Sequence, residues 1–357
     1  MKTRKLSKTS KSNFITYGIV IVCFILVQIL QSAGSMSSLM TGLLVPLCIY
    51  VILAVSLNLV VGISGELSLG HAGFMCIGAF SGAFFSKCMV DVITIGWLRF
   101  IIAIIIGALF AAIFGFLIGM PVLRLKGDYL AIVTLGFGEI IKNVVNVLYV
   151  GRDSNGFHFS TTNTMDLNME PDGQVIINGA QGITNTPKDA TFVIGIILVL
   201  ITLVIVLNLI NSRDGRAIMS IRDNRIAAES LGINVTKYKL VAFTISASLA
   251  GVAGVLYAHN LSALTATTKN FGYNMSIMIL VFVVLGGIGN IRGSMISAVI
   301  LTLLPELLRE MNDYRMLIYS IVLIIMMLFN WAPSALRFRE QANAYIKSKV
   351  PSFKGGK

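Results

Sequence analysis

The chain has 357 residues, of which 56% are hydrophobic and only 12% are charged. This composition, with a mean hydropathy of +0.84, is typical of a polytopic membrane protein and excludes a soluble globular domain. The formal net charge of +12 does not indicate nucleic-acid binding, because the excess of lysine and arginine lies at the ends of apolar segments.

A basic N-terminal tail, residues 1–13, precedes an apolar run that starts at Phe14 and extends to about Leu30. Such a start resembles a signal peptide. No small-residue cleavage site clearly follows the run, so we interpret it as a retained first transmembrane helix.

Apolar segments along the chain predict an all-α membrane protein with about ten transmembrane helices. A helix rises about 1.5 Å per residue, so about 20 apolar residues cross a hydrocarbon core of about 30 Å. The segments without any charged residue are Phe100–Met120, Ala190–Ser212, Leu240–Thr268 and Asn270–Ile291. The expected helices cover roughly residues 14–33, 39–61, 68–90, 99–120, 129–150, 190–211, 240–258, 275–290, 294–310 and 315–333.

Polar residues interrupt the apolar pattern in the glycine-rich stretch 62–82, which contains Glu66, Ser68 and His71. A charged side chain at mid-membrane costs about 2.5–3.5 kcal/mol on insertion scales, so such residues usually face a cavity or a partner. Unwound backbone near the midplane is also how many transporters coordinate polar solutes. We therefore name these three residues as candidates for a substrate pathway. For Glu66, a position at the cytoplasmic interface is the favoured alternative.

The expected helix 129–150 contributes two more pathway candidates, Thr134 and Glu139. Together with Thr134, Gly136 and Gly138 make this helix locally loose and polar. Glu139 and Lys142 are three residues apart, so they can neutralise each other on one helix face. A structural ion pair and a role in transport both remain open for Glu139.

The polar segment 151–189 is too long for a simple turn. It is either a small ordered cap over an outward opening or a flexible insertion. The apolar run Val175–Ile177 is strand-like and favours partial order.

Residues 213–239 form a charged island of six basic and three acidic residues between two apolar segments. Ser220 and Asp223 match an S-x-x-D capping box, and Gly232 is a typical helix terminator, so we expect one short helix at 221–231. An amphipathic helix of this kind suits the docking of a soluble partner. The alternative is a solvated loop whose basic residues only fix the orientation of the chain. The expected apolar face consists of Ile226, Ala227, Ser230 and Leu231, and the charged face of Arg222, Arg225 and Glu229.

Two further patterns are interpreted as structural. Leu285–Ser294, L-G-G-I-G-N-I-R-G-S, lacks the lysine and the preceding strand of a phosphate loop, so we expect a tight turn between two helices. Small residues at helical spacing let helix backbones approach closely in a membrane. They form one stripe of Gly107, Ala111, Gly115 and Gly119 and another of Ser246, Ala250, Gly254 and Ala258.

The distribution of charge predicts the topology. With the N-terminus inside, the cytoplasmic segments hold 20 of the 28 lysines and arginines, in agreement with the positive-inside rule. Both termini are then cytoplasmic, 151–189 is an external loop and 212–239 is a cytoplasmic loop. The expected domains are a transmembrane permease domain, 14–336, between the N-terminal tail and a basic C-terminal tail, 337–357.

The sequence does not indicate an enzyme. It contains no Walker motif, so we do not expect the chain to hydrolyse ATP. His71, His158 and His259 are scattered and form no ligand pair or catalytic triad with suitable spacing. The four cysteines are expected to be apolar fillers rather than disulfides or metal ligands. Neither a metal nor a cofactor of its own is predicted for the chain.

Several of these stretches, taken together, resemble the LivM-type membrane subunits of bacterial branched-chain amino-acid importers of the ABC class. They span most of residues 45–335. The family's short external G-G-x-x-G-I turn corresponds to N-G-A-Q-G-I at 178–183, and about 151–177 looks like an insertion ahead of it. The matching stretches are S-L-N-L-V-V-G-I-S-G-E-L-S-L-G-H-A-G-F (56–74), G-D-Y-L-A-I-V-T-L-G-F-G-E-I-I (127–141), G-R-A-I-M-S-I-R-D-N-R-I-A-A-E-S-L-G-I (215–233), K-Y-K-L-V-A-F-T-I-S-A-S-L-A-G-V-A-G-V-L-Y (237–257) and L-G-G-I-G-N-I-R-G-S (285–294).

The resemblance implies an all-helical core like that of vitamin B12 importers, in a bacterial cytoplasmic (inner) membrane. It implies a second permease subunit, LivH-like or a second copy of this chain. It further implies two ATP-binding subunits that use ATP and Mg, and an external substrate-binding protein. The helix at 221–231 would be the coupling helix that engages the ATPase. The implied ATPase-coupling residues are Arg216, Arg222, Asp223, Arg225, Glu229 and Gly232.

Two other functions stay open. A permease for urea or another short amide shares these motifs. A self-contained channel or ion-coupled carrier would need no ATPase and would use its intramembrane acids as proton or sodium sites.

Overall fold

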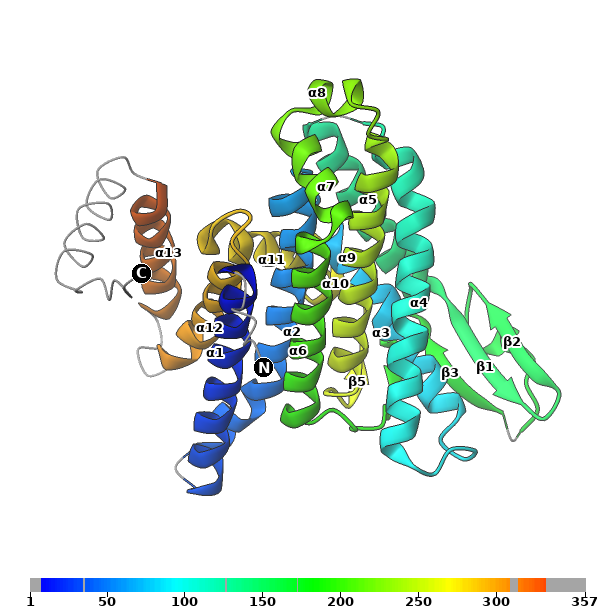
Figure 1. Cartoon of the computed structure of the whole chain (residues 1–357). Helices are drawn as coiled ribbons and strands as arrows, with labels where there is room; N and C mark the ends of the chain where they lie inside the picture. The colour runs from blue at the N-terminus through cyan, green and yellow to red at the C-terminus, as the bar shows by residue number, and fades with distance from the viewer. Residues whose placement is uncertain (1–7, 35, 126, 172, 309–313, 332–357) are drawn as a thin grey trace, which may run out of the picture. The chain divides into compact units, whose positions relative to one another are not determined.

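The structure is a computed structural model that describes residues 8–34, 36–125, 127–171, 173–308 and 314–331. The chain divides into two compact units, the first ending at Val299 and the second beginning at Ile300, and each is considered by itself. The helices of the first unit are α1 (Lys8–Ser32), α2 (Ser38–Asn58), α3 (His71–Cys88), α4 (Gly96–Val122), α5 (Asp128–Val147), α6 (Phe192–Asn211), α7 (Arg213–Asp223), α8 (Arg225–Ser230), α9 (Val235–Ala258), α10 (Thr268–Phe271) and α11 (Tyr273–Gly286) (Figure 1). Helix α12 (Ile291–Leu307) crosses the boundary, and α13 (Arg315–Trp331) lies in the second unit.

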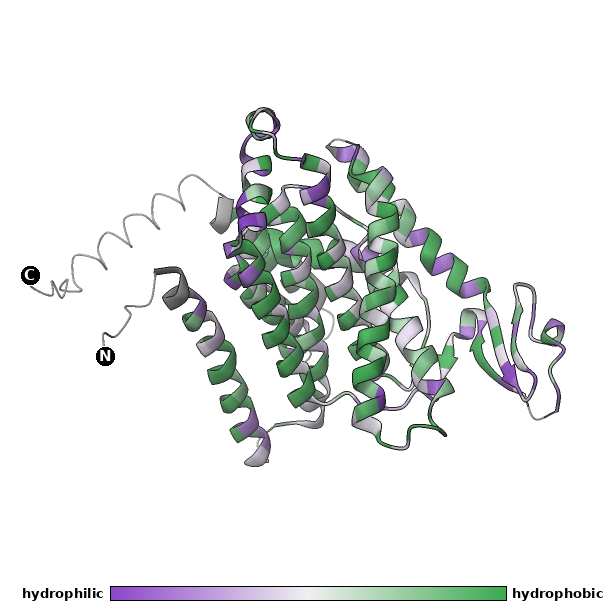
Figure 2. Ribbon diagram, turned by 45° about the vertical axis from the view of Figure 1, so that its right-hand side comes forward, coloured by the Kyte–Doolittle hydropathy of each residue, from purple (hydrophilic) through white to green (hydrophobic). Residues whose placement is uncertain are grey.

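Within the described residues, seven helices are long and apolar enough to cross a membrane. Figure 2 shows hydrophobic residues along most of their length, with hydrophilic residues frequent in the loops and in the small sheet. Helices α3, α12 and α13 occupy three further expected positions but are shorter. Helix α1 begins at Lys8, within the expected N-terminal tail, and its candidate membrane span runs from Asn13 to Ser32. The C-terminal tail, 337–357, lies outside the described residues.

The glycine-rich stretch 62–82 is interrupted over a shorter range than expected. Helix α2 continues into the π-helix η1 (Leu59–Ser64), whose C-cap is Gly65, a residue with φ +75°. The segment 65–70 is unwound, and α3 begins at His71 rather than near residue 68. The glycines that follow, Gly73, Gly78 and Gly82, lie inside α3 and do not break it. They face neighbouring elements at close distance, so their role is in helix packing.

Helices α3, α4 and α9 pack through the small residues that the sequence indicated. A Cβ atom on Gly78 would lie 2.4 Å from Gly251 Cα, and one on Gly254 would lie 2.1 Å from the backbone oxygen of Met75. A Cβ atom on Gly107 would lie 2.3 Å from a methyl group of Val255. Only glycine permits these backbone approaches, so the interpretation of the stripes as packing surfaces is confirmed.

A small β-region makes the all-α expectation incomplete. Strands β1 (Tyr149–Asp153), β2 (Gly156–Ser160) and β3 (Gln174–Asn178) form an antiparallel sheet in the order β2-β1-β3. Strand β3 contains the predicted run Val175–Ile177, so the expectation of partial order is confirmed. Helix α5 ends at Val147 instead of residue 150, because the chain enters β1. The short strands β4 (Ile183–Thr184) and β5 (Ala263–Leu264) pair with each other.

The charged island 213–239, also called the charged loop below, and the β-regions lie at opposite ends of the helices in the first unit. In Figure 1, α8 lies at one end of α9, and β5 lies at the other end. The 3₁₀-helices η2 (Met165–Leu167) and η3 (Gly179–Gln181) complete the β-region between α5 and α6.

Candidate functional site

The charged island 213–239 forms two helices, α7 and α8, and the expectation of a single helix at 221–231 is wrong. Ser212 is the N-cap of α7, since its hydroxyl accepts a 3.0 Å hydrogen bond from Gly215 N. Ser220 does not cap a helix, because its hydroxyl bonds back to the oxygen of Ala217. Asn224 is extended, at φ −154°, and its side chain accepts from Ala227 N at 3.0 Å as the N-cap of α8. Asn224, which ranks with serine as an N-cap residue, is therefore the cap in place of the predicted Ser220.

The predicted helix terminator is confirmed. Gly232 has φ +79°, its N–H bonds to the oxygen of Glu229, and the N–H of Ile233 bonds to the oxygen of Ala228. This pair of bonds is the Schellman arrangement, in which glycine adopts the left-handed conformation without a steric penalty.

The apolar face of α8 points away from the rest of the chain. Ile226 is 80% exposed and Leu231 is 81% exposed, whereas Ala228 is buried in a cluster with Ile221 and Val235. Ile226 lies in the first turn of α8 and Leu231 is its C-cap, and large aliphatic side chains exposed at such a surface helix are typical of an interaction site.

The expected coupling residues of the charged island have different contacts. Arg225 and Glu229 form an exposed i,i+4 ion pair on α8 at 2.9 Å. Arg216 instead donates to the oxygen of Asn211, the last residue of α6, at 3.1 Å. Arg222 donates to the oxygen of Gly62 at 2.8 Å and pairs with Asp223. All six residues are exposed, but Arg216 and Arg222 also bind the backbone of neighbouring elements.

Glu66 is not free to serve a substrate pathway. Its carboxylate pairs with Lys239 of α9, and the two side chains are only 12% and 9% exposed. Lys239 is the last residue of the charged island, so Glu66 lies at the same end of the helices as that loop. The interfacial alternative is thereby favoured over the pathway role for this residue.

Ser68, His71 and Thr134 lie together around the unwound segment 65–70, and all three are buried. Thr134 Oγ1 accepts a 3.0 Å hydrogen bond from Leu69 N. A hydrogen bond of 2.8 Å joins His71 Nε2 to Ser56 Oγ on α2. These polar groups hold the unwound segment against α2 and α5.

Glu139 lies apart from the other candidates, near the start of α11. Its carboxylate accepts from Tyr273 N at 2.8 Å and pairs with Lys142. Lys142 Nζ also donates to Thr268 Oγ1 at 3.0 Å. The structure thus supports the structural ion pair, which joins α5 to the segment α10–α11.

Sequence reasoning missed several polar residues that connect distant elements. Asn58 is fully buried; its side chain donates to Ser294 Oγ at 2.8 Å and accepts from Gly289 N at 2.9 Å. Ser276 accepts from the N–H of Ala72 at 3.1 Å. The signal in the sequence is a single asparagine in an apolar helix, because a buried amide needs a hydrogen-bonding partner. Gly289 belongs to the predicted turn between α11 and α12, and Ser294 lies in the first turn of α12.

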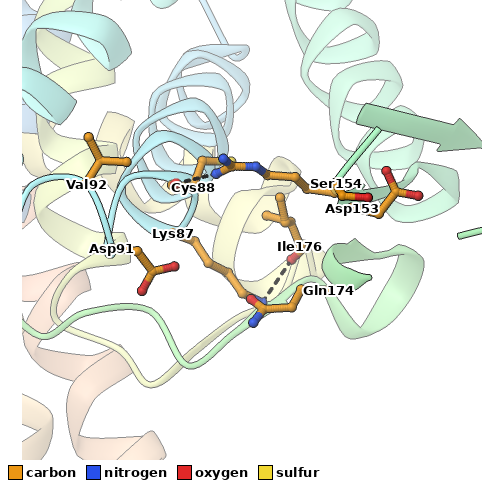
Figure 3. A pocket seen from close by; sticks show the side chains of 9 residues that line it. Lys87, Cys88, Asp91, Val92, Asp153, Ser154, Gln174 and Ile176 are labelled. Carbon is orange, nitrogen blue, oxygen red and sulfur yellow. Dashed lines mark hydrogen bonds between the residues drawn. The ribbon is translucent and has the colours of Figure 1, made fainter. Parts of the chain in front are cut away.

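At the other end of α3, a cavity of about 180 Å³ separates α3 from the sheet, lined by residues that include Lys87, Asp91 and Gln174 (Figure 3). The two nearby cations fasten the sheet to the helix: Arg152 Nη1 donates to Cys88 O at 2.7 Å, and Lys87 Nζ donates to the oxygen of Val175 at 3.1 Å. A cation at the C-terminal end of a helix also suits the helix dipole.

Asp153 also lines this cavity (Figure 3), and it organises the β1–β2 turn. Burial acts to raise the pKa of Asp153, but hydrogen bonds from the backbone N–H groups of Asn155 and Glu170 and pairing with His158 hold this pKa below its usual value. Within the described part of the chain, no group of three or more His, Cys, Asp or Glu side chains is placed to hold a metal ion.

Comparison with known proteins supplies the family. The family described as "Branched-chain amino acid transport system / permease component" matches residues 39–329. The permease protein LivM of the high-affinity branched-chain amino acid transport system of Salmonella typhimurium is 36% identical over 309 residues, which cover 84% of this chain and 70% of the relative. LivM of Escherichia coli is 36% identical over 303 residues, which cover 81% and 67%.

LivH of Escherichia coli, a permease protein of the high-affinity branched-chain amino acid transport system, is 25% identical over 286 residues, which cover 78% of this chain and 88% of the relative. No solved structure is significantly similar to the chain. The family match covers most of the chain, including the unwound segment, α5 and the charged loop. The chain therefore belongs to the family of branched-chain amino acid transport system permease components, and it is of the LivM type.

Proposed function

We propose that this chain is the membrane-spanning permease subunit of an ABC importer for leucine, isoleucine and valine. Separate ATP-binding subunits that use ATP and Mg supply the energy, and an external binding protein delivers the substrate. The observation that carries the proposal is the 36% identity to LivM over most of the chain. The exposed Ile226 and Leu231 on α8 support an ATPase-facing role for the charged loop.

The second permease subunit is LivH-like or a second copy of this chain. The similarity of this chain to LivH supports a LivH-like partner, because related subunits commonly pair about a pseudo-twofold axis. The complex resides in a bacterial cytoplasmic membrane. Transport proceeds by alternating access, in which nucleotide-driven movement of the ATPase dimer displaces α8 and rocks the attached helices.

The proposed topology has ten transmembrane helices around a core like that of vitamin B12 importers, with both termini in the cytoplasm. Helices at all ten expected positions within the described residues support the count. The positive-inside distribution of lysine and arginine supports the orientation.

The test is uptake by proteoliposomes that contain the complete complex with its binding protein. We expect ATP-dependent accumulation of radiolabelled leucine, isoleucine and valine, and none by the purified subunit alone. Accumulation of urea in place of these amino acids would support the short-amide permease. Uptake that a proton or sodium gradient drives without the ATPase would establish a secondary carrier and refute the proposal.

A further inference from the structure

Arg222 at the end of α7 is partly exposed, but its guanidinium group bonds to η1 and not to α8. Its Nη1 atom donates a 2.8 Å hydrogen bond to the backbone oxygen of Gly62 in η1. Asp223 accepts from Nε and Nη2 of the same guanidinium at 3.1 and 2.9 Å. This second pair of bonds fixes the guanidinium plane and leaves Nη1 aimed at Gly62.

The acceptor lies at the C-terminal end of a helix. Since η1 ends at Ser64, Gly62 is among the last residues, whose oxygens lack a partner farther along the helix. A cation at this position satisfies the oxygen and compensates the negative end of the helix dipole. Arg222 therefore caps the long helix formed by α2 and η1.

Three elements meet at the guanidinium group. A Cβ atom on Gly65 would lie 2.7 Å from Arg222 Cγ, and a Cβ atom on Gly289 would lie 3.6 Å from Arg222 Nη1. The end of η1 and the turn between α11 and α12 are themselves in close contact, since a Cβ atom on Gly62 would lie 2.3 Å from Gly289 N. A displacement of Arg222 therefore acts on the end of η1 and on the turn between α11 and α12.

The attachment of α7 to η1 is also apolar. Ile218 of α7 is buried in one cluster with Leu59 and Ile63 of η1. The unwound segment 65–70 follows η1 directly, and its Leu69 N–H bonds to Thr134 on α5. A continuous series of contacts therefore leads from the charged loop to the unwound segment and on to α5.

We propose that Arg222 is a positioning residue that transmits movement of the charged loop to η1 and the unwound segment 65–70, and that it does not contact the ATPase. This inference rests on the proposed function. It divides the expected coupling residues into an outward set on α8, which meets the ATPase, and Arg222, which carries the displacement inward. The contact changes as a unit because packed interfaces shift between discrete arrangements rather than deforming continuously.

The test uses the complete complex in proteoliposomes with Arg222→Gln, Arg222→Lys and Ile226→Asp. We measure the ATPase retained on the purified complex, the rate of ATP hydrolysis and the amount of solute taken up per ATP. Arg222→Gln retains the ATPase and its hydrolysis, but uptake per ATP falls about tenfold or more, as expected for the loss of a hydrogen bond to a charged donor. Arg222→Lys restores part of the ratio, since an ammonium group can donate to the same oxygen. Ile226→Asp loses the ATPase.

A residue that only stabilised the fold would lower hydrolysis and uptake in the same proportion, because fewer complexes would assemble. That outcome for Arg222→Gln, or an unchanged ratio, would overturn the inference. Loss of the ATPase to the extent seen with Ile226→Asp would put Arg222 at the ATPase interface and overturn it as well. Failure of the proposed function is distinct: the wild-type complex would not take up branched-chain amino acids, and the ratio would then be measured with the solute that it does transport.

Discussion

Glu66 and Lys239 are 173 positions apart in the chain, and their pairing explains how a carboxylate is tolerated beside an apolar helix. Both side chains are almost completely shielded from solvent. Removal of one partner would leave an uncompensated buried charge, whereas replacement of both by neutral groups leaves none.

We expect Glu66→Gln or Lys239→Met alone to lower the free energy of unfolding by about 3–5 kcal/mol, and the double variant to recover most of this loss. Thermal unfolding of the purified single and double variants in detergent, combined in a double-mutant cycle, measures the loss in each single variant and its recovery in the double variant. The exposed Arg225–Glu229 pair is the matched control, because an exposed i,i+4 pair contributes only about 0.3–0.5 kcal/mol. Normal stability of Glu66→Gln with impaired substrate binding would return this residue to the pathway.

At the scale of single elements, the glycines of the helices have two different roles. Gly254 on α9 faces the backbone of α3, where a Cβ atom would lie 2.1 Å from the oxygen of Met75. Gly136 on α5 has no atom within 4 Å of an added Cβ atom. The same substitution therefore tests packing at one position and helix propensity at the other.

Gly254→Ala should destabilise the protein by about 1–3 kcal/mol, because α3 and α9 must separate to admit the methyl group. Gly136→Ala should leave the stability unchanged or raise it by about 0.5–1 kcal/mol, since alanine restricts the unfolded chain. Fluorescence-detected size-exclusion chromatography after a heating series gives the comparison. Equal behaviour of the two variants would show that close approach of α3 and α9 is not required.

The charged loop shows how elements are chosen among competing local signals. Ser220 has a matching acidic residue three positions later, yet Asn224 is the N-cap that the chain uses. Ser220 lies inside α7, and the adjacent turn of this helix buries Ile218 against Leu59 and Ile63 of η1. Apolar contact with η1 therefore overrides a local capping pattern.

At the scale of the whole molecule, the charged loop and the small sheet lie at opposite ends of the helices (Figure 1). If the helices span a membrane, Ile226 and Phe159 are accessible from opposite sides. Phe159 is 67% exposed on β2 and Ile226 is 80% exposed on α8, so each position suits a labelling experiment.

In a Cys23→Ser background, which removes the exposed native cysteine, a membrane-impermeant maleimide should label Phe159→Cys in intact cells. It should label Ile226→Cys only after the membrane is opened, because the positive-inside rule assigns the charged loop to the cytoplasm. Labelling of Ile226→Cys in intact cells would refute the proposed orientation. Total labelling after denaturation controls for the amount of protein.

The membrane class, the helix positions and the family were predictable from the sequence, because hydropathy and short motifs are local properties of a chain. The charge pattern also located the loop that carries Ile226 and Leu231. The close packing of the small-residue stripes followed from their spacing, since residues at i and i+4 share one helix face.

The tertiary structure alone decided which polar residues meet. The partners of Glu66, Arg222 and Asn58 come from distant parts of the chain, and no local pattern specifies such a pairing. The same holds for the split of the charged loop into α7 and α8 and for the sheet after α5, which depend on the surfaces available to bury them. A buried polar group must find a partner, but only the folded chain determines which one lies within hydrogen-bonding distance.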